Sequence, residues 1–374
     1  MKVLLTITGL GMGGAERMVT DLADGLVAGG CEVLLVYLTG PLQVRPRRGE
    51  VGVVGLGMKS SGRILGGYSR LRRTVCEFKP DVVHSHMFHA TVMTRLLRLS
   101  TSIPRMISTM HSGYAGGRYR VAAYRCTDWL TDMSTNVSYV ARDNFVASGA
   151  VRRSRMAVVY NGISVEEFRP SPEMRGTLRN SFGIGEDCKL LLAVGRLAHQ
   201  KDYPNLLQAL GLLSQDLQCR LLIAGDGPLR PQLEAMVDDL DLSSRVRFLG
   251  IRRDVAALMA AADVFVHSSS GEPFGLVVAE AMACECVVVA TDTGGVREVL
   301  GDTGFLVPRS DPMALADALR MACALPRAEA IRMGRAARQR VVDTYSFDRA
   351  LEKWRELYSR PLDDTGIEVD QKAG

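Results

Sequence analysis

The chain alternates nearly continuous apolar stretches with amphipathic ones, and this alternation constrains its fold more than any other feature. Residues 2–8 form an apolar run that meets glycines, and residues 15–28 then follow the periodicity of a helix. Strands are apolar throughout when helices cover both faces of a parallel sheet. The pattern predicts a doubly wound α/β architecture, in which ligands bind at the carboxyl ends of the strands.

The alternation occurs twice, and at 374 residues the chain is long enough for two cores. We therefore expect two tandem Rossmann-like domains with parallel sheets and an interdomain cleft, joined through a Pro-rich polar linker at 161–187. A last amphipathic helix is predicted at 347–358, followed by a flexible tail. Strands are predicted at 2–8, 31–38, 80–86, 105–110, 136–139, 156–160, 189–194, 219–224, 246–249, 264–266, 287–290 and 305–307.

Composition narrows the class of protein. The hydrophobic fraction is 47%, yet no run approaches the roughly 18 uninterrupted apolar residues of a membrane span. The eight cysteines are scattered and lack the spacing of metal ligands. We expect reduced thiols and a cytoplasmic protein.

Charge is distributed unevenly along the chain. Residues 1–170 carry 22 Lys and Arg against 12 Asp and Glu, whereas the remainder carries 24 against 29. The basic half has three interpretations: a solvated surface, a surface for anionic membranes or lipid diphosphates, or a nucleic-acid site. Nucleic acid is disfavoured because no recognition motif or run of stacking aromatics accompanies the charge.

A glycine-rich loop at 9–14 formally satisfies the G-x-G-x-x-G pattern of dinucleotide sites. Such a site also needs an acidic residue near the end of the second strand, and residues 37–40 contain none. An NAD site is therefore disfavoured. Gly13 and Gly14 still allow the backbone to approach a phosphate at the helix start, although a tight turn without a ligand is the alternative.

Two cations, Arg196 and Lys201, lie in the loop that follows the first strand of the second domain. At a strand's carboxyl end they can hold a diphosphate leaving group and offset the charge that develops on it. Taken alone, a loop Arg and Lys are more often simply solvated.

The stretch 268–283 joins a buried strand to an apolar helix and carries two carboxylates, Glu272 and Glu280. The free amides of Phe274, Gly275 and Leu276 would point out of the helix start, where positive partial charge favours an anion. A site with amides and carboxylates suits a nucleotide sugar, which has phosphates and many hydroxyls. The alternative is a helix-terminal charge and a surface acid.

Histidines follow two strands of the first domain. His111 comes directly after a strand, as a capping group or as a group facing a ligand. His84 and His86 share one strand face, but no third metal ligand is nearby in sequence, so a metal pair is disfavoured. The acidic pair at 239 and 241 superficially resembles the D-x-D motif of metal-dependent sugar transferases but lies at a polar helix end.

The chain resembles retaining glycosyltransferases of the GT-B architecture, specifically glycosyltransferase family 4. The resemblance covers nearly the whole chain and rests on several motifs in the expected order. These motifs are Gly13-Gly14-Ala15-Glu16, Asp81-Val82-Val83-His84-Ser85-His86, Asn161-Gly162-Ile163, Gly195-Arg196-Leu197 with Lys201, Gly225-Asp226-Gly227-Pro228, and the pair Glu272 and Glu280 in E-x7-E spacing. Ser164 departs from the family, which often has Asp there.

The resemblance implies a role for each site residue. Glu280 would bind the nucleotide ribose, Glu272 the transferred sugar, and Ile251 would lie near the base. Other implied ligand contacts are the diphosphate at Arg196 and Lys201, the amides of 274–276 nearby, Gly13 and Gly14 near the donor phosphate or acceptor, and His111 near the sugar ring. No metal or cofactor would be needed, since the two cations replace a metal.

The resemblance also implies domain boundaries and a function. An acceptor domain at 1–165 would include a crossing helix at 346–360, a donor domain would span 166–345, and 361–374 would be the tail. The expected activity is transfer of a hexose or N-acetylhexosamine from a UDP-sugar, with retention, to a polyprenyl-diphosphate-linked or glycan acceptor for O-antigen or related polysaccharides. The enzyme would bind the inner face of the cell membrane. The alternatives are a nucleotide-sugar epimerase and a non-catalytic lipid- or glycan-binding scaffold.

Overall fold

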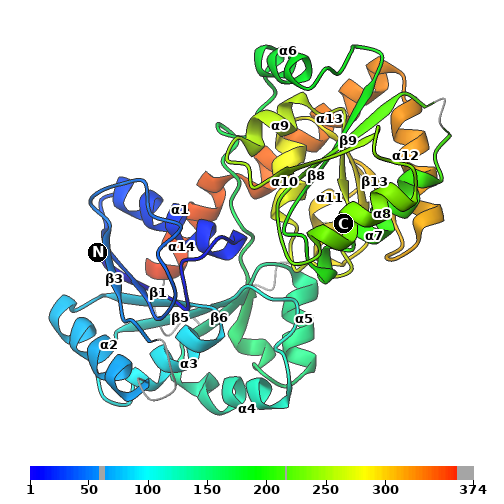
Figure 1. Ribbon diagram of the computed structural model, residues 1–374. Helices are drawn as coiled ribbons and strands as arrows, with labels where there is room; N and C mark the ends of the chain where they lie inside the picture. The colour runs from blue at the N-terminus through cyan, green and yellow to red at the C-terminus, as the bar shows by residue number, and fades with distance from the viewer. Residues whose placement is uncertain (59–63, 215–216, 360–374) are drawn as a thin grey trace. The chain divides into compact units, whose positions relative to one another are not determined.

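The computed structural model describes residues 1–58, 64–214 and 217–359, which divide into two compact units (Figure 1). Of the described residues, the first unit comprises Met1–Gly162 together with residues 348–359, and the second is Ile163–Phe347. The sequence had suggested a domain boundary at residue 165 and a last helix that returns to the first domain. The tail predicted at 361–374 lies outside the described residues.

The first unit is built on a sheet of seven parallel strands in the order β3-β2-β1-β4-β5-β6-β7. The chain begins in the middle of this sheet and adds strands outward on both sides, so the strand order reverses between β1 and β4. The strands are β1 (Lys2–Ile7), β2 (Glu32–Tyr37), β3 (Gly52–Gly55), β4 (Val82–His86), β5 (Arg105–Met110), β6 (Met133–Asn136) and β7 (Met156–Val158).

Helices cover both faces of the first sheet, with α1 and α14 on one face and α2, α3 and α4 on the other (Figure 1). Arg355 on α14 donates to the Gly25 carbonyl of α1 at 3.4 Å, so these helices lie side by side. The helices are α1 (Gly14–Ala28), α2 (Ile64–Phe78), α3 (Phe88–Leu97), α4 (Arg118–Thr127), the 3-10 turn η2 (Asp128–Leu130), α5 (Tyr139–Ala147) and α14 (Phe347–Ser359).

The second unit has a sheet of six parallel strands in the order β10-β9-β8-β11-β12-β13. Its first strand is also central, and the order reverses between β8 and β11. The strands are β8 (Lys189–Val194), β9 (Cys219–Ala224), β10 (Val246–Gly250), β11 (Val264–His267), β12 (Val287–Thr291) and β13 (Phe305–Val307). Two parallel sheets covered by helices confirm the predicted doubly wound α/β class.

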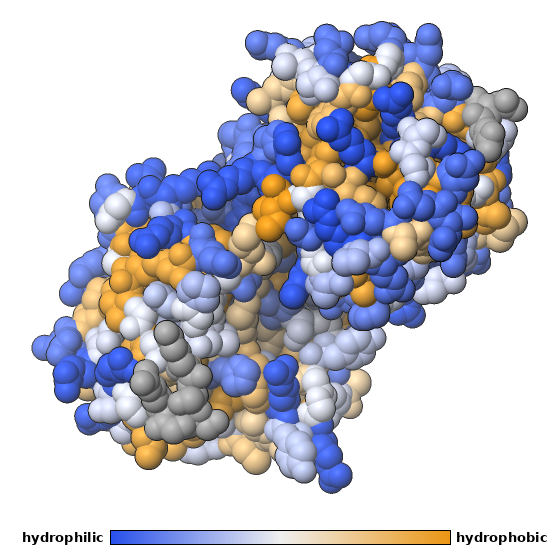
Figure 2. Space-filling model, in the orientation of Figure 1, coloured by the Kyte–Doolittle hydropathy of each residue, from blue (hydrophilic) through white to orange (hydrophobic). Residues whose placement is uncertain are grey.

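One face of the second sheet forms a large apolar core with α7, α8 and α12, and the other face is covered by α6, α9, α10, α11 and α13. Hydrophilic residues are spread over the visible surface of both units and alternate with apolar patches (Figure 2). The helices are α6 (Pro172–Ser181), the 3-10 turn η4 (His199–Lys201), α7 (Tyr203–Gly211), α8 (Arg230–Asp239), α9 (Val255–Ala261), α10 (Leu276–Ala283), α11 (Gly295–Leu300), α12 (Pro312–Ala324) and α13 (Arg327–Arg340). No described helix is both long and apolar enough to span a bilayer.

Two local predictions were wrong. The strand expected at 136–139 is β6 at Met133–Asn136, because Ser138 caps α5 by accepting a hydrogen bond from the Ala141 amide at 3.2 Å. The linker expected at 161–187 contains α6, which opens with a Ser171 cap and Pro172. Helix α6 packs against α9, and its arginines pair with Asp263 at the amino end of β11. It has no continuous apolar stripe.

Candidate active site

The candidate site lies where the strand order of the second sheet reverses, between β8 and β11. Loops that leave neighbouring parallel strands in opposite directions open a crevice at the carboxyl edge of the sheet, and ligands bind there in folds of this kind. The loop after β8 carries Arg196 and Lys201, and the loop after β11 carries Glu272. The strand order therefore brings together two motifs that are far apart in the sequence.

The loop after β8 is held against the loop after β9 by close backbone packing. A side chain on Gly225 would overlap the Gly195 carbonyl, and one on Gly227 would overlap the Leu197 carbonyl. The Leu197 amide donates to the Asp226 carbonyl at 3.0 Å, which locks the two loops together. The glycines of the predicted Gly-Asp-Gly-Pro motif thus position the neighbouring Arg196–Lys201 segment.

Lys201 and Glu272 form an ion pair, with the Lys201 Nζ atom 2.5 Å from Glu272 Oε2. Both side chains are mostly buried, at 16% and 19% exposed, so solvent screens the pair only partly. Two further contacts tie these loops: Ser268 Oγ donates to the Lys201 carbonyl at 2.9 Å, and the Ser270 amide donates to the Gln200 carbonyl at 2.9 Å.

His267, which the sequence analysis did not single out, completes this cluster from the end of β11. Its Nε2 atom lies 3.1 Å from Ser269 Oγ and 3.8 Å from Glu272 Oε2, the latter an electrostatic contact longer than a full hydrogen bond. The side chain is almost completely buried. Its position at the last strand residue before the glutamate loop was the available signal in the sequence.

The cluster sets the charge state of its members. Burial by itself would raise the pKa of Glu272, but the His267 and Lys201 contacts outweigh it and lower that pKa to about 2. Burial lowers the pKa of His267. At neutral pH Glu272 is therefore a carboxylate and His267 a neutral imidazole.

Helix α10 starts directly after this loop. Gly275 caps it in the left-handed region, with φ +94°, and Phe274 is buried with its ring 5.6 Å from that of Tyr345. A side chain on Gly295 would overlap the Pro273 carbonyl, so the start of α11 packs on the same loop. The amides of the predicted 274–276 segment thus lie at a rigid helix start.

The other predicted donor residues of this unit surround the sheet edge. Glu280 is half-buried on α10, and Arg196 is exposed in the loop after β8. Ile251 is 60% exposed immediately after β10, at the same carboxyl edge. Neither Arg196 nor Ile251 is part of the Lys201–Glu272 cluster, and the predicted roles of all three residues stay predictions.

In the first unit, Gly13 caps α1 in an extended conformation and Gly14 is the first residue of that helix, both exposed. His111 follows β5 and is half-buried, and its Nε2 atom lies 3.1 Å from His86 Nδ1. Burial lowers the pKa of His111 to about 4. No group of three or more His, Cys, Asp or Glu side chains within residues 1–58, 64–214 and 217–359 could hold a metal ion, and the expected metal independence stays a prediction.

Comparison with known proteins establishes the family. The family model "Glycosyltransferase Family 4" matches residues 12–167, and "Glycosyl transferases group 1" matches residues 174–340. The chain is 33% identical over 319 residues to D-inositol 3-phosphate glycosyltransferase of Corynebacterium urealyticum, covering 74% of this chain and 75% of that protein. The chain belongs to glycosyltransferase family 4.

Further relatives agree with this assignment. The glycosyltransferase is 30% identical over 313 residues to alpha-maltose-1-phosphate synthase of Mycolicibacterium smegmatis, covering 75% of this chain and 79% of that protein. Its fold matches that of Anabaena HepE, solved in complex with UDP, with a TM-score of 0.85, 23% identity and coverage of 96% and 100%. WaaG, a glycosyltransferase of lipopolysaccharide biosynthesis, matches with a TM-score of 0.75, 21% identity and coverage of 96% and 100%. The fold is therefore GT-B, as predicted.

Proposed function

We propose that this glycosyltransferase moves a hexose or N-acetylhexosamine, with retention of configuration, from a UDP-sugar to a lipid-linked or glycan acceptor. The observation that carries the proposal is the Lys201–Glu272 pair at the point where the second sheet reverses its strand order. Anabaena HepE, which shares the fold, was solved with UDP and with UDP-glucose. WaaG acts in lipopolysaccharide biosynthesis, which supports a cell-surface polysaccharide as the product class.

Each residue has a role in this reaction. Lys201 and Arg196 stabilise the negative charge that develops on the departing diphosphate, without a metal ion or other cofactor. Glu280 binds the ribose, Ile251 contacts the base, and the amides of 274–276 lie near the donor. In the first unit, Gly13 and Gly14 face the donor phosphate or the acceptor, and His111 faces the sugar.

Glu272 acts as an ionised group. With a pKa of about 2 it carries no proton at neutral pH, so it cannot serve there as a general acid. A carboxylate beside the sugar can attack it as a nucleophile or stabilise the positive charge of an oxocarbenium-like transition state, and we propose the stabilising role. This role suits attack on the face that the diphosphate leaves, which retains the configuration.

The test combines a donor panel with two site variants. UDP-, GDP- and dTDP-sugars are incubated with the purified protein and an acceptor, and the product anomer is determined by NMR. Lys201→Ala and Glu272→Ala should each reduce transfer by about 10–100-fold, since a charge-assisted hydrogen bond contributes roughly 1.5–3 kcal/mol. Lys353→Ala removes the lysine of an exposed Lys–Glu pair on α14 and serves as the matched control.

Two outcomes would contradict the proposal. Absence of turnover with every donor would remove the function, and wild-type rates in both site variants would remove the site. Interconversion of sugars with donor alone would identify an epimerase instead.

The proposal includes attachment to the cytoplasmic face of an anionic membrane through one surface of the first unit. The exposed face of α4 continues into η2 and combines arginines with aromatic side chains. We call it the α4 surface, and it consists of Arg118, Tyr119, Ala122, Arg125, Cys126 and Trp129. Trp129 is 60% exposed, and its ring nitrogen donates to the Cys126 carbonyl at 3.1 Å, so the apolar ring is the part presented to a lipid.

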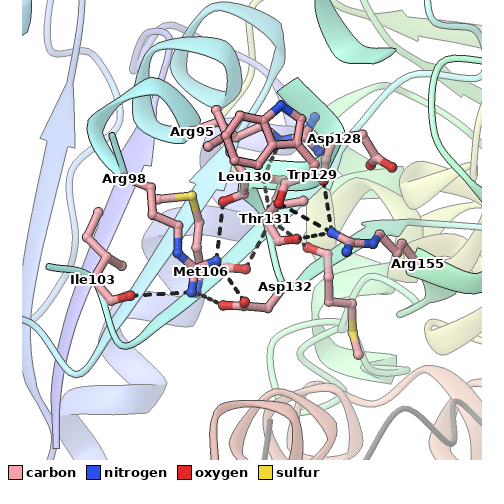
Figure 3. Close-up of polar contacts among 12 residues, drawn as sticks. Arg95, Arg98, Ile103, Met106, Asp128, Trp129, Leu130, Thr131, Asp132 and Arg155 are labelled. Carbon is pink, nitrogen blue, oxygen red and sulfur yellow. Dashed lines mark hydrogen bonds and ion pairs between the residues drawn. The ribbon is translucent and has the colours of Figure 1, made fainter. Parts of the chain in front are cut away.

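Hydrogen bonds from three arginines, one completely buried and two partly buried, hold the backbone beneath this surface. Arg98 and Arg155 approach the turn around Trp129 from opposite sides (Figure 3), donating to Asp132 Oδ1 at 2.7 Å and to the Thr131 carbonyl at 2.9 Å. Arg95 is completely buried and donates to Ser134 Oγ at 2.8 Å. A rigid aromatic side chain flanked by arginines is suited to the headgroup region of an anionic bilayer.

A further inference from the structure

Three imidazoles form a ladder at the carboxyl edge of the first sheet. His84 and His86 lie on β4 and are completely buried, and His111 follows the neighbouring strand β5. The ring centroids of His84 and His86 are 4.0 Å apart, and those of His86 and His111 are 5.3 Å apart. The reaction proposed above uses only His111, so the two buried histidines need an explanation.

His84 has a structural role. Its Nδ1 atom lies 2.6 Å from the Tyr358 hydroxyl of α14, and its Nε2 atom lies 2.6 Å from Thr109 Oγ1. Both ring nitrogens are therefore occupied, and the Trp354 ring covers the imidazole with centroids 4.6 Å apart. His84 joins α14 to the sheet.

His86 differs because only one of its nitrogens has a partner. Nδ1 lies 3.1 Å from His111 Nε2, whereas Nε2 is buried and has no hydrogen-bond partner in the described part of the chain. Burial lowers the pKa of both histidines, so both rings are neutral at pH 7. Between two neutral imidazoles, one nitrogen must donate and the other must accept.

The unpartnered nitrogen of His86 decides the direction of this hydrogen bond. If His86 carried its proton on Nε2, a buried N–H group would lack an acceptor, which is rarer in proteins than a buried acceptor without a donor. The proton of His86 therefore belongs on Nδ1, from which it is donated to His111 Nε2. His111 must then carry its own proton on Nδ1.

We propose that His86 is a positioning residue that holds His111 in the Nδ1–H tautomer. His111 is then a hydrogen-bond donor toward an oxygen atom of the sugar nucleotide, and it does not act as a base through Nδ1. This role toward the ligand rests on the proposed function, whereas the tautomer is a property of the free protein.

The backbone around His86 is constrained in a way that supports a positioning role. The next residue, Met87, has φ +68° and ψ +163°, a region that is essentially restricted to glycine. Its amide donates to the Thr109 carbonyl at 3.3 Å, and its own carbonyl accepts from the Thr91 amide at 2.9 Å. Strain of this kind persists where the surroundings over-determine a conformation, and here it fixes the chain next to His86.

The test is ¹⁵N NMR of the ligand-free protein with labelled histidine side chains. The chain has 6 histidines, and the His111 signals are assigned by their loss in His111→Gln. The expected result is an N–H type shift at His111 Nδ1 and an unprotonated type at Nε2. The reverse pattern would overturn the inference whatever the enzyme's activity.

Variants of His86 test the positioning role. His86→Phe removes the donor but keeps a ring, and it should mix the two His111 tautomers and lower kcat about 10-fold while the affinity for UDP changes less than 2-fold. His86→Asn can donate from its amide near the position of Nδ1 and should restore the Nδ1–H tautomer. His89→Phe, on the exposed face of α3, is the control and should change neither readout.

The outcomes separate this inference from the proposed function. An unchanged His111 tautomer in a folded His86→Phe protein would overturn the inference. If His86→Phe fails to fold, the His86→Asn spectrum decides, since loss of the Nδ1–H pattern there contradicts the expected rescue. A correct tautomer in a protein that turns over no donor would count against the proposed function alone.

Discussion

At the scale of single residues, the partly buried Lys201–Glu272 pair is the feature with the clearest energetic consequence. Its members lie on different loops, and each loses solvation that the partner must replace. Burial acts against the charge on Glu272, and the contacts with His267 and Lys201 outweigh it. The ionisation of Glu272 at acid pH, below its ordinary pKa of 4.5, therefore depends on contacts made only in the folded protein.

We expect Lys201→Met to destabilise the second unit in a pH-dependent way. The pKa of Glu272 is about 2 in the folded protein against 4.5 ordinarily, so the folded state binds fewer protons between these values. The stabilisation is complete above about pH 5 and is lost as the pH falls toward 2. Lys201→Met should cost about 1–3 kcal/mol at pH 7, and the difference from wild type should narrow at pH 3.

Urea unfolding at pH 7 and pH 3 measures this difference. The control, Lys353→Met, breaks an exposed pair and should change stability by less than about 0.5 kcal/mol at either pH. A Lys201→Met effect of equal size at both pH values would contradict the assigned pKa of Glu272.

At the scale of elements, the loops after β8 and β9 are packed against each other through their backbones. The backbone contact at Gly227 leaves no room for a side chain, because an added Cβ would overlap the Leu197 carbonyl. We expect Gly227→Ala to lower stability by about 1–3 kcal/mol through overpacking. It should also weaken UDP binding, because it displaces the segment that carries Lys201.

Differential scanning calorimetry and UDP titration check this prediction together. Gly185→Ala is the matched control, since nothing lies within 4 Å of an added Cβ there. Unchanged melting temperature and UDP affinity in Gly227→Ala would show that the loop contact does not position the site.

Helix α14 is joined to the first unit by a buried hydrogen bond between Tyr358 and His84. We expect Tyr358→Phe to destabilise this unit by about 1–3 kcal/mol, because one ring nitrogen of His84 is left buried without its partner. Tyr119→Phe alters a side chain that is 85% exposed and should be neutral in the same urea unfolding measurement. Equal stabilities for the two variants would rule out a contribution from this bond.

At the scale of the whole molecule, residues 1–170 carry an excess of positive charge, and two of their arginines, Arg118 and Arg125, lie on the α4 surface. We expect the protein to bind vesicles containing anionic lipid, with affinity falling as salt rises, because exposed charges are screened within about 8 Å at physiological ionic strength. Arg125→Ser should weaken binding about 5-fold, on the order of 1 kcal/mol per arginine at the surface. Vesicle sedimentation across a salt series measures this.

One control variant and one further test variant accompany the vesicle experiment. Arg332→Ser changes an arginine on α13 of the second unit, whose side chain is 80% exposed, and should leave binding unchanged. Trp129→Ser tests the aromatic contribution. Equal binding to neutral and anionic vesicles, or none to either, would contradict the proposed attachment.

The sequence alone determined the class of fold, since the apolar runs and glycine-rich loops report which faces of each element are buried. The apolar run at 264–266 predicted a strand, and the loop with Glu272 before an apolar helix predicted an anion-binding helix N-terminus. Both predictions rest on signals that are local in the sequence. Helix α6 was not predicted from the sequence. Its capping signals are local too, but its packing depends on Arg175 and Arg179 meeting Asp263, a residue distant in sequence.

Only the tertiary structure decided which elements are neighbours. Pairing β8 with β11 brings Lys201 to Glu272 and adds His267, and pairing β4 with β5 places His86 beside His111. Periodicity along a chain carries no information about strand order, which is set by long-range packing and by the closure of the loops between strands. The sequence therefore predicted which residues belong to each motif, whereas the contacts of Glu272 with Lys201 and His267, and of His111 with His86, are determined only by the tertiary structure.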